Sequence, residues 1–452
     1  MKSKIDFINS DTRSSLMKMI LPLFAAMVLM LAYSMVDSIW VGNLLGENGY
    51  AALTTAGSIS IILNAIAMGI SNGASIIVSQ LVGKGNQKES NEAVSTVLVS
   101  TGVFCLVLVG VMKVFLKQFL NLFGTPVSIY EDAFQYLQIF LIGYFFLYMY
   151  VQLTAIFRSY GDSMLQMLGM LAGTIINAAI DPIFIHFYGI KGAAYATTLT
   201  QIFCFLFILV YVKKKAYFQF HISMVHTRAL KEIVKNAVPC CLQQCIPAVS
   251  SMIMVVLVNR FDITTIAAYG VIKSIENILF YPAMAMNMGL MTIIGQCTGA
   301  KRKDRVHDYV KTGCIYGGLI EAVLTALVVV SAKYISRLFV NSAAVGEIVA
   351  HALVIIGVGY VCYMMTSIFM AELSGKGKPV LSMNLMFIYY IVIRVPLAVG
   401  LLHTKLKLDG MWFAILVSHI IALLLGILMT REWKIQTKSF QKISNYRQKS
   451  GC

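Results

Sequence analysis

Residues 67–83 read AMGISNGASIIVSQLVG, and residues 283–299 read AMAMNMGLMTIIGQCTG. A shift of 216 positions aligns the two stretches without a gap, and it also places Ala51-Ala52 on Ala267-Ala268. The matching pairs are Ala67 and Ala283, Met68 and Met284, Gly73 and Gly289, Ile77 and Ile293, Gln80 and Gln296, and Gly83 and Gly299. A long internal repeat in so apolar a chain predicts a transporter built from two similar helix bundles around a central site.

The composition places the chain among membrane proteins. Of its 452 residues, 58% are hydrophobic and 12% are charged, whereas soluble domains carry roughly 25% charged residues. The mean hydropathy is +0.78. The net charge of +16 does not indicate nucleic-acid binding, because the basic residues lie in short loops and a tail between apolar runs.

Twelve apolar segments are long enough to span a bilayer, which needs about 20 residues. They fall six before and six after a basic linker, so the two halves start on the same side and the repeat is parallel. We therefore predict an all-α integral membrane protein with an amino lobe at 1–212, a cytoplasmic linker at 213–235, a carboxy lobe at 236–430 and a basic cytoplasmic tail at 431–452. The segments are 16–41, 52–82, 92–115, 132–157, 163–187, 190–212, 236–259, 264–298, 308–331, 347–374, 379–402 and 409–430.

Lysine and arginine predict the orientation. Of the 36 basic residues, 26 lie on the side of the N-terminus, 8 lie on the opposite side, and Lys273 and Arg394 lie inside segments. Since basic loops stay in the cytoplasm, we predict a multi-pass protein of the cell membrane with both termini cytoplasmic.

Three polar residues inside apolar segments are candidates for an ion site. Asp37 lies in the first segment, and Asn177 and Asp181 lie four apart on the fifth, so those two share one helix face. A carboxylate in hydrocarbon is costly and usually serves a function. Two alternatives stay open: Asp37 caps the end of its helix, and the Asn177–Asp181 pair bonds a neighbouring helix.

Other residues are less informative. Pro22 precedes Asp37 by fifteen residues and is either a hinge or a first-turn proline. Lys273 and Glu276 share a helix face and can neutralise each other. The sequence assigns no role to Glu321, Glu372 or Arg394. The three cysteines at 240, 241 and 245 lack the histidine or second cysteine pair of a zinc site. No phosphate-binding loop and no catalytic cluster is present, so we expect neither a cofactor nor an enzyme.

Four ordered stretches resemble the MATE family, the multidrug and toxin extrusion transporters, over essentially the whole chain, and the bacterial MepA-like branch is the subgroup it resembles. They are Val36-Asp37-Ser-Ile-Trp-Val41-Gly42 followed by Ala51-Ala52; Gln80-Leu-Val-Gly83-Lys-Gly; Gly161-Asp162, Asn177-Ala-Ala-Ile-Asp181-Pro182 and Gly192-Ala-Ala-Tyr-Ala196-Thr197; and Pro239, Ala267-Ala268-Tyr-Gly270 and Gly295-Gln296-Cys-Thr-Gly299-Ala300.

The resemblance implies export of organic, often cationic, drugs in exchange for H⁺ or Na⁺, and hence antibiotic resistance. It implies a cation site at Asp37, Asn177 and Asp181, lined by Tyr33, Tyr136, Thr154 and Thr198. Some family members carry two further acids in the carboxy lobe, where this chain has Pro247 and Tyr363. We therefore expect coupling in the amino lobe, and a packing surface or substrate wall in the carboxy lobe.

Two other functions stay open at this stage. A flippase of a lipid-linked precursor would require a large, strongly basic cavity, and a membrane-embedded enzyme would require a convergent catalytic cluster. The expected partners are small organic substrates and the lipid bilayer, without nucleic acid. A chain with two lobes can act as a monomer.

Overall fold

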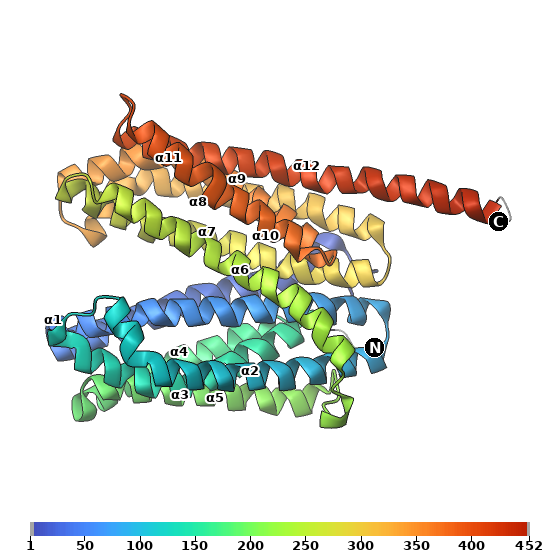
Figure 1. Ribbon diagram of the computed structural model, residues 1–452, viewed down its shortest axis with the longest axis horizontal. Coiled ribbons are helices and arrows are strands. Elements are labelled where there is room, and N and C mark those ends of the chain that lie inside the picture. The colour runs from blue at the N-terminus through green and yellow to red at the C-terminus, as the bar shows by residue number, and fades with distance from the viewer. Residues whose placement is uncertain (1–3, 450–452) are drawn as a thin grey trace. The chain divides into compact units, whose positions relative to one another are not determined.

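The computed structural model describes residues 4–449, and within them every regular element is helical (Figure 1). The all-α prediction is therefore confirmed. The elements are α1 (Thr12–Lys84), α2 (Gln87–Leu122), α3 (Val127–Ser159), α4 (Met164–Tyr188), α5 (Ile190–Lys215), the short η1 (Ile222–Met224), α6 (Thr227–Val258), α7 (Ile263–Gly299), α8 (Lys303–Phe339), α9 (Ala343–Gly375), α10 (Pro379–Phe387), the π-helical η2 (Ile388–Arg394), α11 (Val395–Leu402) and α12 (Leu408–Lys449).

Eleven helices of the described chain are long and apolar enough to cross a membrane, when α10, η2 and α11 are taken as one continuous segment. The first of them, α1, has 73 residues and contains two predicted spans. These meet at Gly46, whose φ of 69° and ψ of −161° break the helical conformation. Because only glycine adopts this conformation readily, Gly46 marks the turn between the first and second of twelve spans.

The chain divides into two compact units. The first, here called the amino unit, contains the residues up to Cys245 together with Gly295–Arg305, and the carboxy unit contains Ile246–Ile294 and the residues from Val306 onward. The amino unit includes the start of α6 because a Cβ atom on Gly73 would lie only 2.4 Å from the Cα of Ala237. The boundaries predicted from the sequence for the amino lobe, the linker and the carboxy lobe stay a prediction.

The repeated glutamine–glycine motif has a reciprocal role in the amino unit. A Cβ atom on Gly83 would lie 1.9 Å from the carbonyl oxygen of Gln296, and one on Gly299 would lie 1.9 Å from that of Gln80. The side-chain amide of Gln296 donates to the carbonyl of Ser159 at 2.6 Å. The two copies of the motif thus pack directly on each other, since glycine allows the closest approach between helices.

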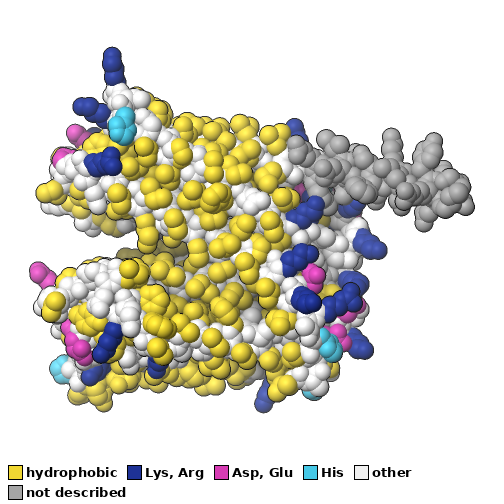
Figure 2. Space-filling model, viewed as in Figure 1, with side chains coloured by type: hydrophobic (Ala, Val, Ile, Leu, Met, Phe, Trp, Pro, Cys, Tyr) yellow, Lys and Arg dark blue, Asp and Glu magenta, His cyan; other side chains and the backbone are white. Residues whose placement is uncertain are grey.

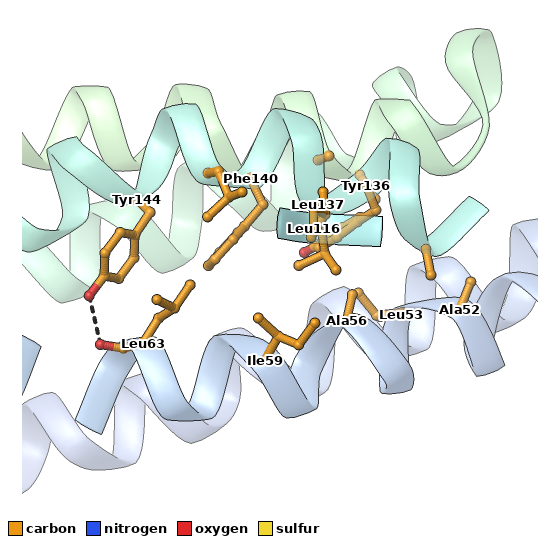
Figure 3. Packing of buried hydrophobic residues seen from close by; sticks show 14 of the residues in the cluster. Ala52, Leu53, Ala56, Ile59, Leu63, Leu116, Tyr136, Leu137, Phe140 and Tyr144 are labelled. Carbon is orange, nitrogen blue, oxygen red and sulfur yellow. Dashed lines mark hydrogen bonds between the residues drawn. The ribbon is translucent and has the colours of Figure 1, made fainter. Parts of the chain in front are cut away.

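The core of the amino unit is built on α3, which packs against α1, α2 and α5 (Figure 1). Tyr136, Phe140, Tyr144 and Tyr148 follow one face of α3 at intervals of four residues, with ring centroids 6.1 to 6.3 Å apart. Small and branched side chains of α1 face this row, and the Tyr144 hydroxyl donates to the carbonyl of Leu63 at 2.6 Å (Figure 3). Figure 2 shows apolar side chains along the helices and basic side chains at their ends, as expected for membrane spans.

The structure decides between the two interpretations of Pro22. Helix α1 begins at Thr12, and its N-cap Asp11 accepts a hydrogen bond from the amide of Ser14 at 2.8 Å. Pro22 therefore lies well inside the helix and not in its first turn. A proline cannot donate to the carbonyl four residues earlier, here that of Lys18. The hydroxyl of Ser163 lies 3.5 Å from this carbonyl and partly replaces the missing donor.

Candidate functional site

Asp37, Asn177 and Asp181 come together inside the amino unit. Asp37 on α1 is 7% exposed, and both residues on α4 are fully buried. The Asn177 amide donates to one oxygen of Asp181 at 2.9 Å, and the Asp37 carboxyl interacts electrostatically with Asp181. The arrangement is not fully explained by a helix cap at Asp37, because that residue is buried. Nor is it explained by a bond from the Asn177–Asp181 pair to a neighbouring helix, because the hydrogen bond of the Asn177 amide stays within α4.

The site contains acceptor oxygens without donors. Oδ1 of Asp37, Oδ1 of Asn177 and Oδ2 of Asp181 are buried, and none has a hydrogen-bond partner among the described residues. Buried polar atoms are nearly always satisfied in folded proteins, so an unsatisfied group needs an explanation such as an ion or water. Oxygen atoms of carboxylates and amides are suitable ligands for a proton or a hard cation.

Two tyrosines and one threonine extend the site. Tyr33 and Tyr136 each interact electrostatically with Asp37 and Asp181, and both hydroxyls approach Thr197 on α5. Both tyrosines were predicted to line the site, whereas Thr197, which is 4% exposed, entered only as the last residue of a family motif. Its position directly beside the predicted Thr198 was a further signal that could have found it.

Thr198 and Thr154 lie elsewhere. The Thr198 hydroxyl donates to the carbonyl of Ile139 on α3 at 3.3 Å and so bonds a helix backbone. Thr154 is eighteen residues beyond Tyr136 on the same continuous helix, which separates them by about 27 Å at 1.5 Å per residue. Its hydroxyl donates to Val151 in its own helix. The structure therefore does not bring Thr154 to the Asp37 site.

The carboxy unit has a buried charged network of its own. The Lys273 ammonium and the Glu276 carboxylate, both on α7, lie 2.6 Å apart, and Tyr360 on α9 donates to Glu276 at 3.4 Å. The predicted pairing of Lys273 with Glu276 is confirmed. The carboxy lobe was expected to supply mainly a packing surface or substrate wall, and the carboxy unit also contains this ion pair, whose Glu276 is buried.

Arg394 is the second centre of this network and is 4% exposed. Its guanidinium donates to Ser418 at 3.0 Å, to Tyr389 at 2.7 Å and to His419 at 3.3 Å. It also stacks on Tyr390, with 4.4 Å from Cζ to the ring centroid. The histidine was not singled out from sequence, although a buried imidazole inside a membrane span is itself a signal of function.

The two remaining acids of the carboxy unit differ from each other. Glu372, near the end of α9, forms an ion pair with Lys376 one turn later, which explains its presence there. Glu321 on α8 is 1% exposed, and neither of its carboxyl oxygens has a hydrogen-bond partner among the described residues. Among those residues, no group of three or more side chains could hold a metal ion through His, Cys, Asp or Glu.

Twelve apolar spans in one repeated chain, with polar groups buried inside them, define a multi-pass membrane transporter of small molecules. The chain belongs to the MatE family, whose model matches residues 22–183 and 239–399. Family and fold both point to a non-enzymatic transporter.

The relatives agree with this assignment. The chain is 27% identical over 420 residues to the probable multidrug resistance protein YoeA of Bacillus subtilis, covering 90% of each. It is 21% identical to the multidrug export protein MepA of Staphylococcus aureus, covering 94% of each, in line with the branch named from sequence. It also matches the fold of the Vibrio cholerae MATE transporter VcmN in the bent form, with a TM-score of 0.88, 21% identity, and coverage of 93% of this chain and 96% of that one.

Proposed function

We propose that this protein is a cation-coupled antiporter that exports organic, mainly cationic, compounds by alternating access. The observation that carries the proposal is the set of buried, unpartnered oxygens on Asp37, Asn177 and Asp181. Their arrangement favours binding of a positively charged species inside the amino unit. The names of the relatives, which refer to multidrug resistance and export, favour drug export over lipid flipping.

Two carboxylates close together in a buried site repel each other. One proton or one Na⁺ ion relieves this repulsion, and the Asn177 carbonyl can add an uncharged oxygen ligand. The ion and the substrate must stabilise different conformations for their movements to be coupled. Loading of the Asp37–Asp181 pair would therefore favour the state that releases the substrate outward.

Pro22 is the proposed hinge of this change. It lies on the same helix as Asp37, and the Lys18 carbonyl that it frees receives a long contact of 3.5 Å from the Ser163 hydroxyl. A helix that lacks one internal hydrogen bond bends more easily at that point. Ion binding at Asp37 can therefore be transmitted to the first half of α1.

We further propose that the protein resides in the cell membrane with both termini in the cytoplasm, as its basic loops favour, and that it acts as a monomer. Both repeats belong to one chain, so no partner is needed to complete the pair of bundles. The partners are small organic substrates and the bilayer, without nucleic acid or cofactor.

Ethidium efflux from cells tests the coupling site. Asp37→Asn and Asp181→Asn should each abolish efflux at normal expression, because an amide can neither bind a proton nor attract a cation as strongly. Glu47→Gln is the matched control, since Glu47 follows the turn at Gly46 and is exposed. Unchanged efflux by either aspartate variant would remove that residue from the mechanism.

The coupling ion is identified in proteoliposomes with pH and Na⁺ gradients imposed separately. A proton-coupled carrier responds to the pH gradient alone, and a Na⁺-coupled carrier to the Na⁺ gradient alone. Transport that continues undiminished without either gradient would contradict antiport.

A further inference from the structure

The charged network of the carboxy unit plays no part in the proposed coupling at Asp37 and Asp181. Burying charged side chains in a membrane is costly, and such groups usually mark a substrate or ion pathway. Lys273 and Arg394 are both basic and lie in this network together with a single contacting acid, Glu276. By direct contacts the network therefore holds two bases and one acid, and Glu321 interacts with Tyr360 without contacting either base.

Arg394 has no acidic partner in direct contact. Among the residues whose side chains are described, its hydrogen bonds go to a serine, a tyrosine and a histidine, and Glu276 interacts with it only at longer range. Glu321 forms no ion pair with either base. A buried guanidinium is normally paired with a carboxylate or phosphate, so this one lacks its usual anion.

The network also has donors to spare. The ammonium of Lys273 has three donors, of which Glu276 takes one. The indole nitrogen of Trp412 is buried and has no acceptor among the described residues. This indole stacks on Tyr269, one turn before Lys273, with ring centroids 6.2 Å apart. In the amino unit, buried acceptor oxygens lack hydrogen-bond donors. In this network of the carboxy unit, donors lack acceptors.

Lys273 is the most exposed charged residue of the network. Its side chain is 30% exposed, whereas that of Glu276 is 2% exposed. The rest of the network is buried and closely packed. A Cβ atom on Gly359 would lie 2.9 Å from the His419 ring, and η2 is a π-helical segment, a feature frequent at functional sites. It brings Tyr389, Tyr390 and Arg394 into the buried interior.

We propose that Lys273 and Arg394 form a subsite in the carboxy unit for the carboxylate group of a transported molecule. Lys273 donates to the carboxylate directly, and Arg394 adds a second positive charge that no contacting acid neutralises. The substrates would then include zwitterionic or anionic organic compounds besides simple cations. This inference rests on the proposed function, since it takes the bound molecule to be transported, but its test measures binding alone.

The test uses two dyes with the same ring system. Rhodamine 19 carries a free carboxylate, and rhodamine 6G carries its ethyl ester. Binding of each to the purified full-length protein in nanodiscs is measured by fluorescence anisotropy. In the variant Lys273→Gln/Glu276→Gln, which removes both partners of the ion pair together, rhodamine 19 should bind about tenfold more weakly, the effect of one lost charge-assisted hydrogen bond. Rhodamine 6G should change by less than about twofold and so reports that the protein is folded.

Two further variants complete the test. Lys273→Arg keeps the charge and should retain rhodamine 19 binding, and Lys333→Gln, at an exposed lysine of α8, should change neither dye. The proposal is overturned if the wild type does not bind rhodamine 19, if both dyes weaken equally in the double variant, or if neither weakens. None of these outcomes depends on coupling through Asp37 or Asp181, so the two proposals fail separately.

Discussion

In the amino half, the hydroxyl of Tyr144 donates to a backbone carbonyl, whereas 216 positions later the hydroxyl of Tyr360 donates to the carboxylate of Glu276. Each tyrosine follows a glycine, Gly143 or Gly359, onto which a polar side chain of another helix packs. The two halves thus share their packing residues and differ in their charged ones. Glycine and tyrosine serve any pair of crossing helices, but a charge buried in a membrane usually marks a functional site.

The acids and bases are distributed unequally between the halves. The amino unit buries Asp37 and Asp181, which at the same shift fall on Ile253 and Leu397. The carboxy unit buries Arg394, which falls on Ala178. We therefore propose that the two copies of the repeat favour different ligands, a cation in the amino unit and a carboxylate in the carboxy unit.

The largest expected effect concerns the two acids of the amino unit. Asp37→Asn and Asp181→Asn should each reduce gradient-driven export by at least about tenfold, which corresponds to 1.4 kcal/mol of coupling. The double variant should be no worse than either single one, because residues that act as a unit have non-additive effects. Initial rates in proteoliposomes measure all three variants. A double variant that loses the product of the single losses would show that the acids act independently.

A second prediction tests whether the charges of the carboxy unit depend on each other. Glu276→Gln should lower the free energy of unfolding by about 2 kcal/mol, because it leaves Lys273 without its anion, and the partial exposure of Lys273 keeps the cost below that of a fully buried pair. Lys273→Met/Glu276→Met should be close to neutral, since it removes both charges together. Thermal unfolding in detergent gives the comparison. Equal destabilisation by both variants would mean that the pair is held by packing and not by charge.

A third prediction concerns the motif that the two halves share. Gly83→Ala and Gly299→Ala should each cost about 1–3 kcal/mol, because the added methyl group meets a backbone carbonyl that cannot move aside. Gly110→Ala on α2, with no atom within 4 Å of the added carbon, is the matched control and should be neutral or stabilising. If only one of the two motif variants unfolds earlier than the control, the motif copies are not equivalent.

The smallest effect is expected at the equivalent tyrosines. Tyr144→Phe should cost about 1 kcal/mol, the usual net value of one buried hydrogen bond. Tyr360→Phe should cost less, because its bond to Glu276 is 3.4 Å long and Lys273 also holds that carboxylate. Unfolding temperatures measured side by side decide the order, and a larger loss for Tyr360→Phe would reverse this assignment.

The sequence by itself determined the features that depend on local composition. Twelve spans, the six-plus-six repeat and the family all follow from apolar length and ordered motifs. The shared face of Asn177 and Asp181 follows from helical spacing, and so does the pairing of Lys273 with Glu276. The two side-chain pairs depend on residues that are close together in the chain, and the spans, the repeat and the family depend on patterns that are read directly along it.

Tertiary structure alone decided which residues of different helices meet. Adjacent residues point about 100° apart around a helix, so the rotation of α5 selects Thr197 for the tyrosines and turns Thr198 toward α3. The same reason explains why Arg394 and His419, distant in sequence and on separate helices, form one network. Helix rotation is set by packing against neighbours, and a hydropathy pattern that is nearly uniform around a membrane helix does not record it.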